Sequence, residues 1–248
     1  MTLPRIGAVL PLVLAALALG LLALGPLGLR LGWWAYGFGL YRLMPASGLV
    51  AAIAVVLAIL ALAREWSRLR PGGRAMLFVA LALAASLVYV PVFYWQTRKT
   101  VPPIHDITTD LDNPPAFSAV LPARAAERAG SLDRRTPQLG ELQKAAYPDL
   151  APLTTTLPPT RAFAAALEVA KSMPGWTIVA ADPATGRIEA NETSRWFRFV
   201  DDIVIRVAPD GSGSRIDIRS ESRQGRSDFG VNARRIRAYL QTLKTHLA

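Results

Sequence analysis

Hydrophobic residues form three long runs in the first part of the chain: Ile6–Leu29, Pro45–Ala63 and Ala75–Trp95. The first run has 24 residues and no charge. At about 1.5 Å per residue it would extend roughly 36 Å, enough to cross a hydrocarbon core of about 30 Å. A cleaved signal peptide is the rival interpretation, but the run is too long for a typical signal core and two further apolar runs follow. The pattern therefore predicts three transmembrane helices.

Shorter periodic patterns follow after residue 158. Apolar residues at helical spacing (Phe163, Ala166, Leu167 and Ala170) predict a helix over 161–173 that Thr160 caps and Pro174-Gly175 ends. A last helix is predicted to begin at a Ser227 or Asp228 cap and to reach about Leu247. Its buried stripe would consist of Phe229, Ala233, Ile236, Leu240, Leu243 and Leu247.

Four strands are predicted between these two helices. They cover Trp176–Ala180, Arg187–Thr193, Ile203–Val207 and Arg215–Ser222, and the third could begin as early as Trp196. The turns Asp182–Gly186 and Pro209–Gly213 are short, which makes the sheet antiparallel. We expect an α+β fold, in which two main helices cover one face of a four-stranded antiparallel sheet.

These patterns divide the chain into three parts. Residues 1–96 form a membrane region, 97–158 a proline-rich connector with an irregular segment, and 159–248 the α+β core of the soluble domain. Four prolines between Val101 and Phe117 prevent a continuous helix there. We expect that stretch to lie extended on the domain, with Ile104, Ile107 and Phe117 as apolar anchors. Residues 118–158 show little periodicity and are expected to be loop and short turns.

The charge distribution predicts the orientation. The chain has a formal net charge of +10, but residues 1–96 carry seven arginines and one acid, Glu65. Four of these arginines lie between the second and third runs, which places that loop in the cytoplasm by the positive-inside rule. The N-terminus would then be cytoplasmic and residues 97–248 would face the periplasm or an equivalent exterior space. Arg98 and Lys99 argue weakly against this orientation.

Several chemistries are excluded or disfavoured by composition. The absence of cysteine excludes disulfides, thiolate catalysis and cysteine-metal sites. The apolar runs contain no Asp, Glu, Lys or His, which disfavours an ion or proton pathway. No nucleophile, phosphate-binding or dinucleotide motif is present. The arginines of the last helix (Arg234, Arg235 and Arg237), expected to be exposed, lack the interleaved aromatic residues of nucleic-acid binders, so we expect no nucleic-acid partner.

Four stretches of the second half resemble one family. They are PPIHDITTDLDNPPAF (102–117), AAYPDLAPL (145–153), FVDDIVIRV (199–207) and RSESRQGRSDFGVNARRIRAYL (219–240). In this order they are similar to the bacterial and plastid family known as domain of unknown function 1499. The resemblance implies a shared domain over about residues 101–245, often behind an N-terminal membrane segment. It implies no activity, cofactor or catalytic residue.

The first candidate site is a basic segment with Arg219, Arg223 and Arg226 that leads into Asp228. Guanidiniums beside a helix N-terminus favour an anion such as a phosphate, a lipid headgroup or a partner's carboxylate. The alternative is structural: Asp228 caps the helix, and the arginines pair with Asp201, Asp202 or Glu221.

Two further candidates contain acidic residues, and each also has a structural explanation. Asp201 and Asp202 would point to opposite faces of a strand, so a salt bridge fits them better than paired acid–base catalysis. His105 and Asp106, with Asp110 and Asp112, could in principle hold a metal, but their spacing matches no metal motif and local hydrogen bonds explain them better. We therefore expect no metal and no cofactor.

The sequence favours a membrane-anchored periplasmic binding or interaction domain without catalysis. Its partner would be an envelope protein or lipid headgroups. The first alternative is an enzyme or small-ligand carrier that uses the surface of Asp201, Asp202, Arg223 and Arg226. The second is an accessory subunit of a larger membrane complex, bound through its helices.

The predicted orientation can be measured with reporters fused after Ala248. Alkaline phosphatase folds only outside the cytoplasm and should be active there, whereas a cytoplasmic fluorescent reporter should stay dark. The matched control carries both reporters in the loop that holds Arg68 and Arg70, where the signals should be reversed. Bright cytoplasmic fluorescence from the C-terminal fusion would overturn the orientation.

Overall fold

The computed structural model describes residues 6–132 and 137–247. The chain forms two compact units: a mainly helical one over Met1–Thr97 and Trp196–Arg198, and a second one over Arg98–Arg195 and Phe199–Ala248. Each unit is described here by itself.

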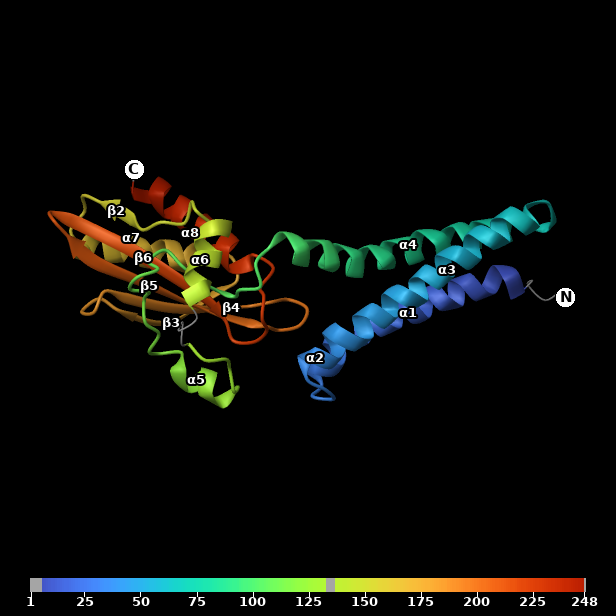
Figure 1. Ribbon diagram of the computed structural model, residues 1–248, viewed down its shortest axis with the longest axis horizontal. Helices are drawn as coiled ribbons and strands as arrows, with labels where there is room; N and C mark the ends of the chain where they lie inside the picture. Colours follow the sequence, from blue (N-terminus) through green and yellow to red (C-terminus); the bar gives the residue numbers. More distant parts are fainter. Residues whose placement is uncertain (1–5, 133–136, 248) are drawn as a thin grey trace. The chain divides into compact units, whose positions relative to one another are not determined.

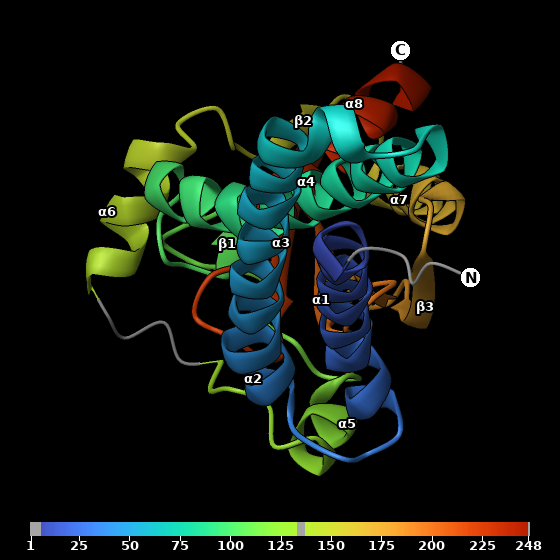
Figure 2. The same ribbon diagram turned by 90° about the vertical axis from the view of Figure 1, so that its right-hand side faces the viewer.

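The first unit consists of α1 (Ile6–Arg30), α3 (Met44–Glu65) and α4 (Pro71–Thr100), with the short α2 (Tyr36–Phe38) and a π-helical turn Gly39–Leu43 between α1 and α3. All three long helices are long and apolar enough to cross a membrane. In both views α1 and α3 run side by side (Figures 1 and 2). Alanines at their contact, such as Ala15, Ala18 and Ala54, have no exposed surface, because small side chains let the backbones approach closely.

The second unit is built around a six-stranded antiparallel sheet with the order β1-β6-β5-β4-β3, in which β2 also pairs with β6. Four strands follow the chain as hairpins: β3 (Trp176–Asp182), β4 (Arg187–Thr193), β5 (Val200–Asp210) and β6 (Gly213–Ser222). The β3–β4 turn ends at Gly186, whose φ of 64° favours glycine and where a Cβ would overlap the carbonyl oxygen of Val207.

The expected four-stranded sheet was wrong in its strand number. The two additional strands, β1 (Asp106–Thr108) and β2 (Leu153–Thr155), have three residues each and pair with the two halves of the free edge of β6. A strand of three residues is too short to show alternation, and its pairing is fixed by a partner far along the chain. Residues 118–158 likewise contain more than loops: α5 (Leu121–Ala126), α6 (Pro137–Ala146) and β2.

Two helices cover the apolar face of the sheet, as expected: α7 (Pro159–Ser172) and α8 (Val231–Leu247). Figure 1 shows them together on one side of the sheet, with α5 apart from them. Their buried residues pack on an isoleucine-rich layer that includes Ile188, Ile205 and Ile218. Tyr239 lies at the centre of this core; its hydroxyl donates to Ala166 O at 3.0 Å and its ring stacks on Trp176.

Both helix starts differ from the sequence expectation. Pro158 is the N-cap of α7, and Thr160 lies inside the helix, because proline fits the first turn. The last helix begins at Val231 because Phe229 and Gly230 adopt positive φ angles. Its expected stripe holds at Ala233, Ile236 and Leu243, which have no exposed surface, whereas Tyr239 was missed.

Candidate functional site

The second face of the sheet carries a buried set of charged residues, here called the charge network: Asp106, Arg124, Asp202, Arg219, Glu221 and Arg223. Alternation along β5 and β6 directs these side chains away from α7 and α8. The chain between β1 and residue 132 covers them. Phe117 and Val120 pack on Val204 at the same face, so apolar contacts seal the layer.

Asp202 lies in the middle of the charge network and has no exposed surface. Arg223 holds both of its oxygens, with Nε to Oδ2 at 2.9 Å and Nη2 to Oδ1 at 2.7 Å. Arg124 from α5 donates to the same Oδ2 at 2.8 Å. Because an ion is costly to bury unless partners replace its water, these two arginines are what permits a carboxylate here.

A second arginine–carboxylate pair lies where β1 meets β6. Arg219 donates Nε and Nη2 to the two oxygens of Asp106, each at 2.9 Å. Glu221 accepts from Arg124 at 3.1 Å and from Arg219 at 3.5 Å. Burial, with Asp106 nearby, raises the pKa of Glu221 to about 8 against the opposing effect of the two arginines. Glu221 thus keeps its proton to a higher pH than an ordinary glutamate.

Glu189 of β4, on the same face, binds the backbone of the residues just before α5. Its carboxylate accepts three backbone N–H groups, from Ser118 at 2.9 Å and from Ala119 and Val120 at 3.0 Å each. Glu189 is 1% exposed, so these bonds form without competing water. The charge network and Glu189 together attach the whole segment 106–126 to the sheet.

The structure separates the residues of the proposed anion site. Arg219 and Arg223 are 4% exposed each and bind carboxylates within the network. Arg226 is exposed and forms no hydrogen bond or ion pair with any described residue. The carboxylate of Asp228 accepts from the N–H groups of Gly230 at 2.8 Å and Asn232 at 2.6 Å, and so caps α8. This geometry corresponds to the structural alternative of paired arginines and a capping Asp228.

Asp201 points to the opposite face from Asp202, as the alternation predicts. It accepts from Arg235 of α8 at 2.7 Å, and Arg235 also binds Glu192 at 2.7 Å. The expectation that Arg235 is exposed was wrong: its side chain lies on the buried side of α8, with 7% of its surface exposed. Asp201 and Asp202 therefore belong to two separate ion-pair groups.

His105 and Asp106 contribute mainly through backbone and ion-pair contacts. The carbonyl of His105 accepts from Ser222 N at 3.1 Å and from Asn232 Nδ2 at 2.9 Å, while its buried Nδ1 has no partner among the described residues. Asp106 is bound by Arg219. Within residues 6–132 and 137–247, no group of three His, Asp or Glu side chains could hold a metal ion.

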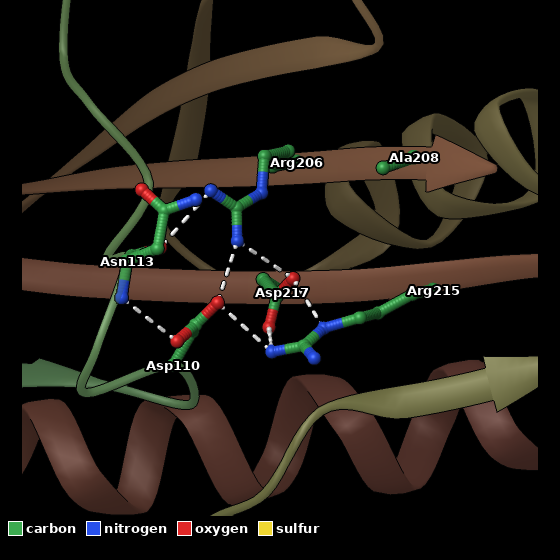
Figure 3. A pocket seen from close by; sticks show the side chains of 6 residues that line it. All are labelled: Asp110, Asn113, Arg206, Ala208, Arg215 and Asp217. Carbon is green, nitrogen blue, oxygen red and sulfur yellow. Dashed lines mark hydrogen bonds and ion pairs between the residues drawn. The ribbon is translucent and has the colours of Figure 1, made fainter. Parts of the chain in front are cut away.

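A shallow cleft of about 320 Å³ lies further along the charged face (Figure 3). Asp110 Oδ2 accepts hydrogen bonds there from Arg206 and Arg215, at 2.9 Å each. Asp217 accepts from the same two arginines. Burial alone would raise the pKa of Asp110, but the Asn113 N–H and these guanidiniums hold it below its usual value. Two arginines and two aspartates cancel in charge, so the cleft has no net attraction for an anion.

The sequence analysis named Asp110 only within a possible metal group, and it missed Arg124, Glu189 and the other charged residues of this cleft, Arg206, Arg215 and Asp217. One signal was available: the alternation in Arg215–Arg223 places Asp217, Arg219, Glu221 and Arg223 on one face of β6. No pattern around Arg124 or Glu189 indicates a partner, because those partners lie 78 and about 70 residues away in the chain.

Replacing Asp202 should destabilise the sheet domain strongly. In Asp202→Ala, Arg124 and Arg223 stay buried without their main partner, which we expect to lower the unfolding free energy by about 3–5 kcal/mol. Asp182→Ala is the matched control: Asp182 ends β3, and its carboxylate bonds only Ala184 and Thr185 of the adjacent turn, so we expect a loss of about 1 kcal/mol or less. Denaturant unfolding of the full chain in detergent, followed by near-ultraviolet circular dichroism, measures both. A smaller loss in Asp202→Ala than in the control would contradict the role of the network.

Glu221 should make stability depend on pH. Its pKa of about 8 in the folded protein lies above the ordinary 4.5, so between these values the folded state holds a proton that the unfolded state has released. The unfolding free energy should therefore fall as pH rises through this window, by at most about 1.4 kcal/mol per pH unit from this group. Glu221→Gln should flatten that slope and the exposed control Glu141→Gln should keep it. Equal slopes in the two variants would show that Glu221 is ionised throughout.

Comparisons with known proteins give a family for the second part of the chain. No curated protein matches the chain. Among solved structures, protein CV1439 from Chromobacterium violaceum is similar at 16% identity over 39% of this chain and 93% of its own, with a TM-score of 0.23. Protein TTHA0849 from Thermus thermophilus is similar at 14% identity over 39% of this chain and 88% of its own, with a TM-score of 0.21. Residues 106–243, from the start of β1 into α8, match a family model, and the chain therefore belongs to the family described as protein of unknown function (DUF1499).

Proposed function

We propose that this protein is a membrane-anchored binding domain without catalysis, which holds a sheet domain at the outer surface of the inner membrane. Its three apolar helices act as the anchor, with the N-terminus in the cytoplasm and residues 97–248 in the periplasm. The domain recognises a partner at that surface, either an envelope protein or lipid headgroups.

The proposal rests on one observation: the charged side chains of the network bind one another. Asp202 accepts from both Arg124 and Arg223 and has no exposed surface, so no substrate can reach it. An acid–base group must come within hydrogen-bond distance of a reacting atom. The charged residues most suggestive of chemistry thus hold the domain together, and binding is left to exposed surfaces such as that of Arg226.

The same contacts count against an enzyme or small-ligand carrier that uses Asp201, Asp202, Arg223 and Arg226. That function requires a concave pocket lined by these groups. Asp201 and Asp202 instead lie on opposite faces of β5, and the 320 Å³ cleft is lined by Arg206, Arg215 and their aspartates. An accessory-subunit role through the helices is distinguished by the experiment below.

Purification of the tagged full chain from its own membranes in a mild detergent tests the proposal. Native mass spectrometry then detects bound proteins and retained lipids together. The matched control is the helical region alone, residues 1–100. We expect a stoichiometric protein or a defined set of lipids that is retained by the full chain and lost from the control. A partner held equally by residues 1–100 would contradict a binding role for the sheet domain and favour a subunit bound through its helices.

A further inference from the structure

One of the two sheet edges is covered by the chain itself. Beyond β6 lie the short strands β1 and β2, which have three residues each. Gln143 of α6 is 2% exposed and covers the outer side of β1. Its Nε2 donates to Thr108 O at 2.6 Å, and its Oε1 accepts from Thr108 N at 3.1 Å. A buried amide side chain thus takes the place of a further strand at this edge.

The opposite edge is β3, which is the outermost strand on its side (Figure 1). No strand of the described chain pairs with its outer side, and none of its seven residues is fully buried. Natural edge strands usually carry lysine or proline, or are very short, which prevents pairing with another chain. The sequence WTIVAAD (176–182) contains no basic residue and no proline. This edge is therefore open to one more strand.

A β-bulge places an unpaired residue in the middle of β3. Ile178 pairs with Ala190 and Ala180 with Glu189, so Val179 has no partner on β4. The backbone of a bulged residue stays outside the ladder, and Val179 is 41% exposed. Many bulges turn an edge away from further strands. Here the extra residue is a valine, so the centre of the edge offers an apolar contact and no charge.

We propose that the β3 edge is the interface for a second copy of this chain, whose β3 pairs with it in antiparallel orientation about a two-fold axis at Val179. Each copy contributes the same strand, so the interface is self-complementary and closes at a dimer. Main-chain hydrogen bonds continue the sheet from one copy into the other. The two Asp182 carboxylates, the only charges of the strand, lie at opposite ends of the interface, roughly 20 Å apart.

The charges of α7 favour a second copy over an unrelated strand. α7 lies over the β3 half of the sheet, and the chain reverses between the two elements, at Pro174-Gly175. Both elements are about 21–23 Å long, so their middles lie side by side. The two-fold axis therefore places exposed Arg161 of each copy level with the partner's Glu168, which is also exposed. Opposite charges then face each other twice across the interface.

Pairing of one short strand is weak by itself, because an isolated two-stranded pair is marginal in water. Three apolar helices that confine every copy to one bilayer raise the effective concentration of the partner edge. This step rests on the proposed membrane anchor, whereas the interface itself rests on the sheet domain alone. The dimer should therefore form in a membrane and dissociate as the protein is diluted with lipid.

The absence of cysteine permits a direct test of the register by disulfide formation in the full chain, reconstituted in liposomes. Val179→Cys places two thiols across the axis, where opposite Cβ atoms lie about 4.5–5.5 Å apart, close to the spacing of a disulfide. Mild oxidation should link two copies at least about tenfold faster than in Thr154→Cys. This matched control is an exposed strand residue of β2, at the other edge. Equal rates in the two variants would overturn the proposal.

A charge at the axis should separate the two copies. Donor-labelled and acceptor-labelled full chains, each labelled at Ser212→Cys in the β5–β6 turn, report dimers by energy transfer during dilution with lipid. Val179→Lys sets two lysines opposite each other and should raise the apparent dissociation constant at least about tenfold. Thr154→Lys should leave it unchanged, and near-ultraviolet circular dichroism should show both variants folded. Equal energy transfer in the two variants would contradict the interface.

The outcomes are distinguishable from failure of the proposed function. A chain that stays monomeric, yet retains a stoichiometric envelope protein or defined lipids, removes the dimer and leaves the binding role intact. A disulfide dimer at Val179→Cys, with a partner held equally by residues 1–100, supports the interface and removes the proposed recognition by the sheet domain. Energy transfer that persists in Val179→Lys and in residues 1–100 assigns dimerisation to the helices. Linkage of Val179→Cys to a different protein assigns the edge to a foreign strand. Either of these last two results removes the proposal.

Discussion

The sheet domain depends on a set of ion pairs that replaces water on the part of one sheet face formed by β5 and β6. Most two-layer domains leave the second face of an antiparallel sheet in solvent. Here β5 and β6 direct Asp202, Arg219 and Arg223 into a layer closed by residues 106–132. Every buried charge in this layer needs its partner, because a lone ion in such surroundings is far more costly than a lone apolar residue. The connector and α5 are therefore attached by charge on this face, whereas α7 and α8 are attached mainly by apolar packing on the other.

This arrangement explains why the charged motifs of the sequence do not assemble into a reactive site. Arg223 and Asp202 satisfy each other with two hydrogen bonds, and Arg219 does the same with Asp106. Residues outside the layer, such as Arg226 and Trp196, keep their functional groups open to the surroundings. In the proposed binding role, stability and recognition therefore use different residues. The segment after α4 contributes to stability because it supplies β1, which pairs with β6.

The sequence predicted the elements whose signal is local. The hairpin β3–β4 was identified by alternation and by the turn at Gly186, and the extended connector by its prolines and by Ile104, Ile107 and Phe117, which are all buried. The edge strands β1 and β2 could not be predicted, since three residues contain no period and their partner β6 lies far away in the chain. The burial of the charged face could not be predicted for a related reason. Alternating charge in β6 is typical of a solvated face, and only the distant Arg124 and Asp106 make it a buried one.

The central claim is that Arg124 and Asp202 act as a coupled pair that attaches α5 to the sheet. A double-mutant cycle on the full chain, with Arg124→Ala, Asp202→Ala and the two combined, measures that coupling directly from their unfolding free energies. The structure predicts a coupling energy of about 2–3 kcal/mol, so that the double variant is much less destabilised than the sum of the single ones. Losses that add to within about 0.5 kcal/mol would show the two residues to be independent and would contradict the account.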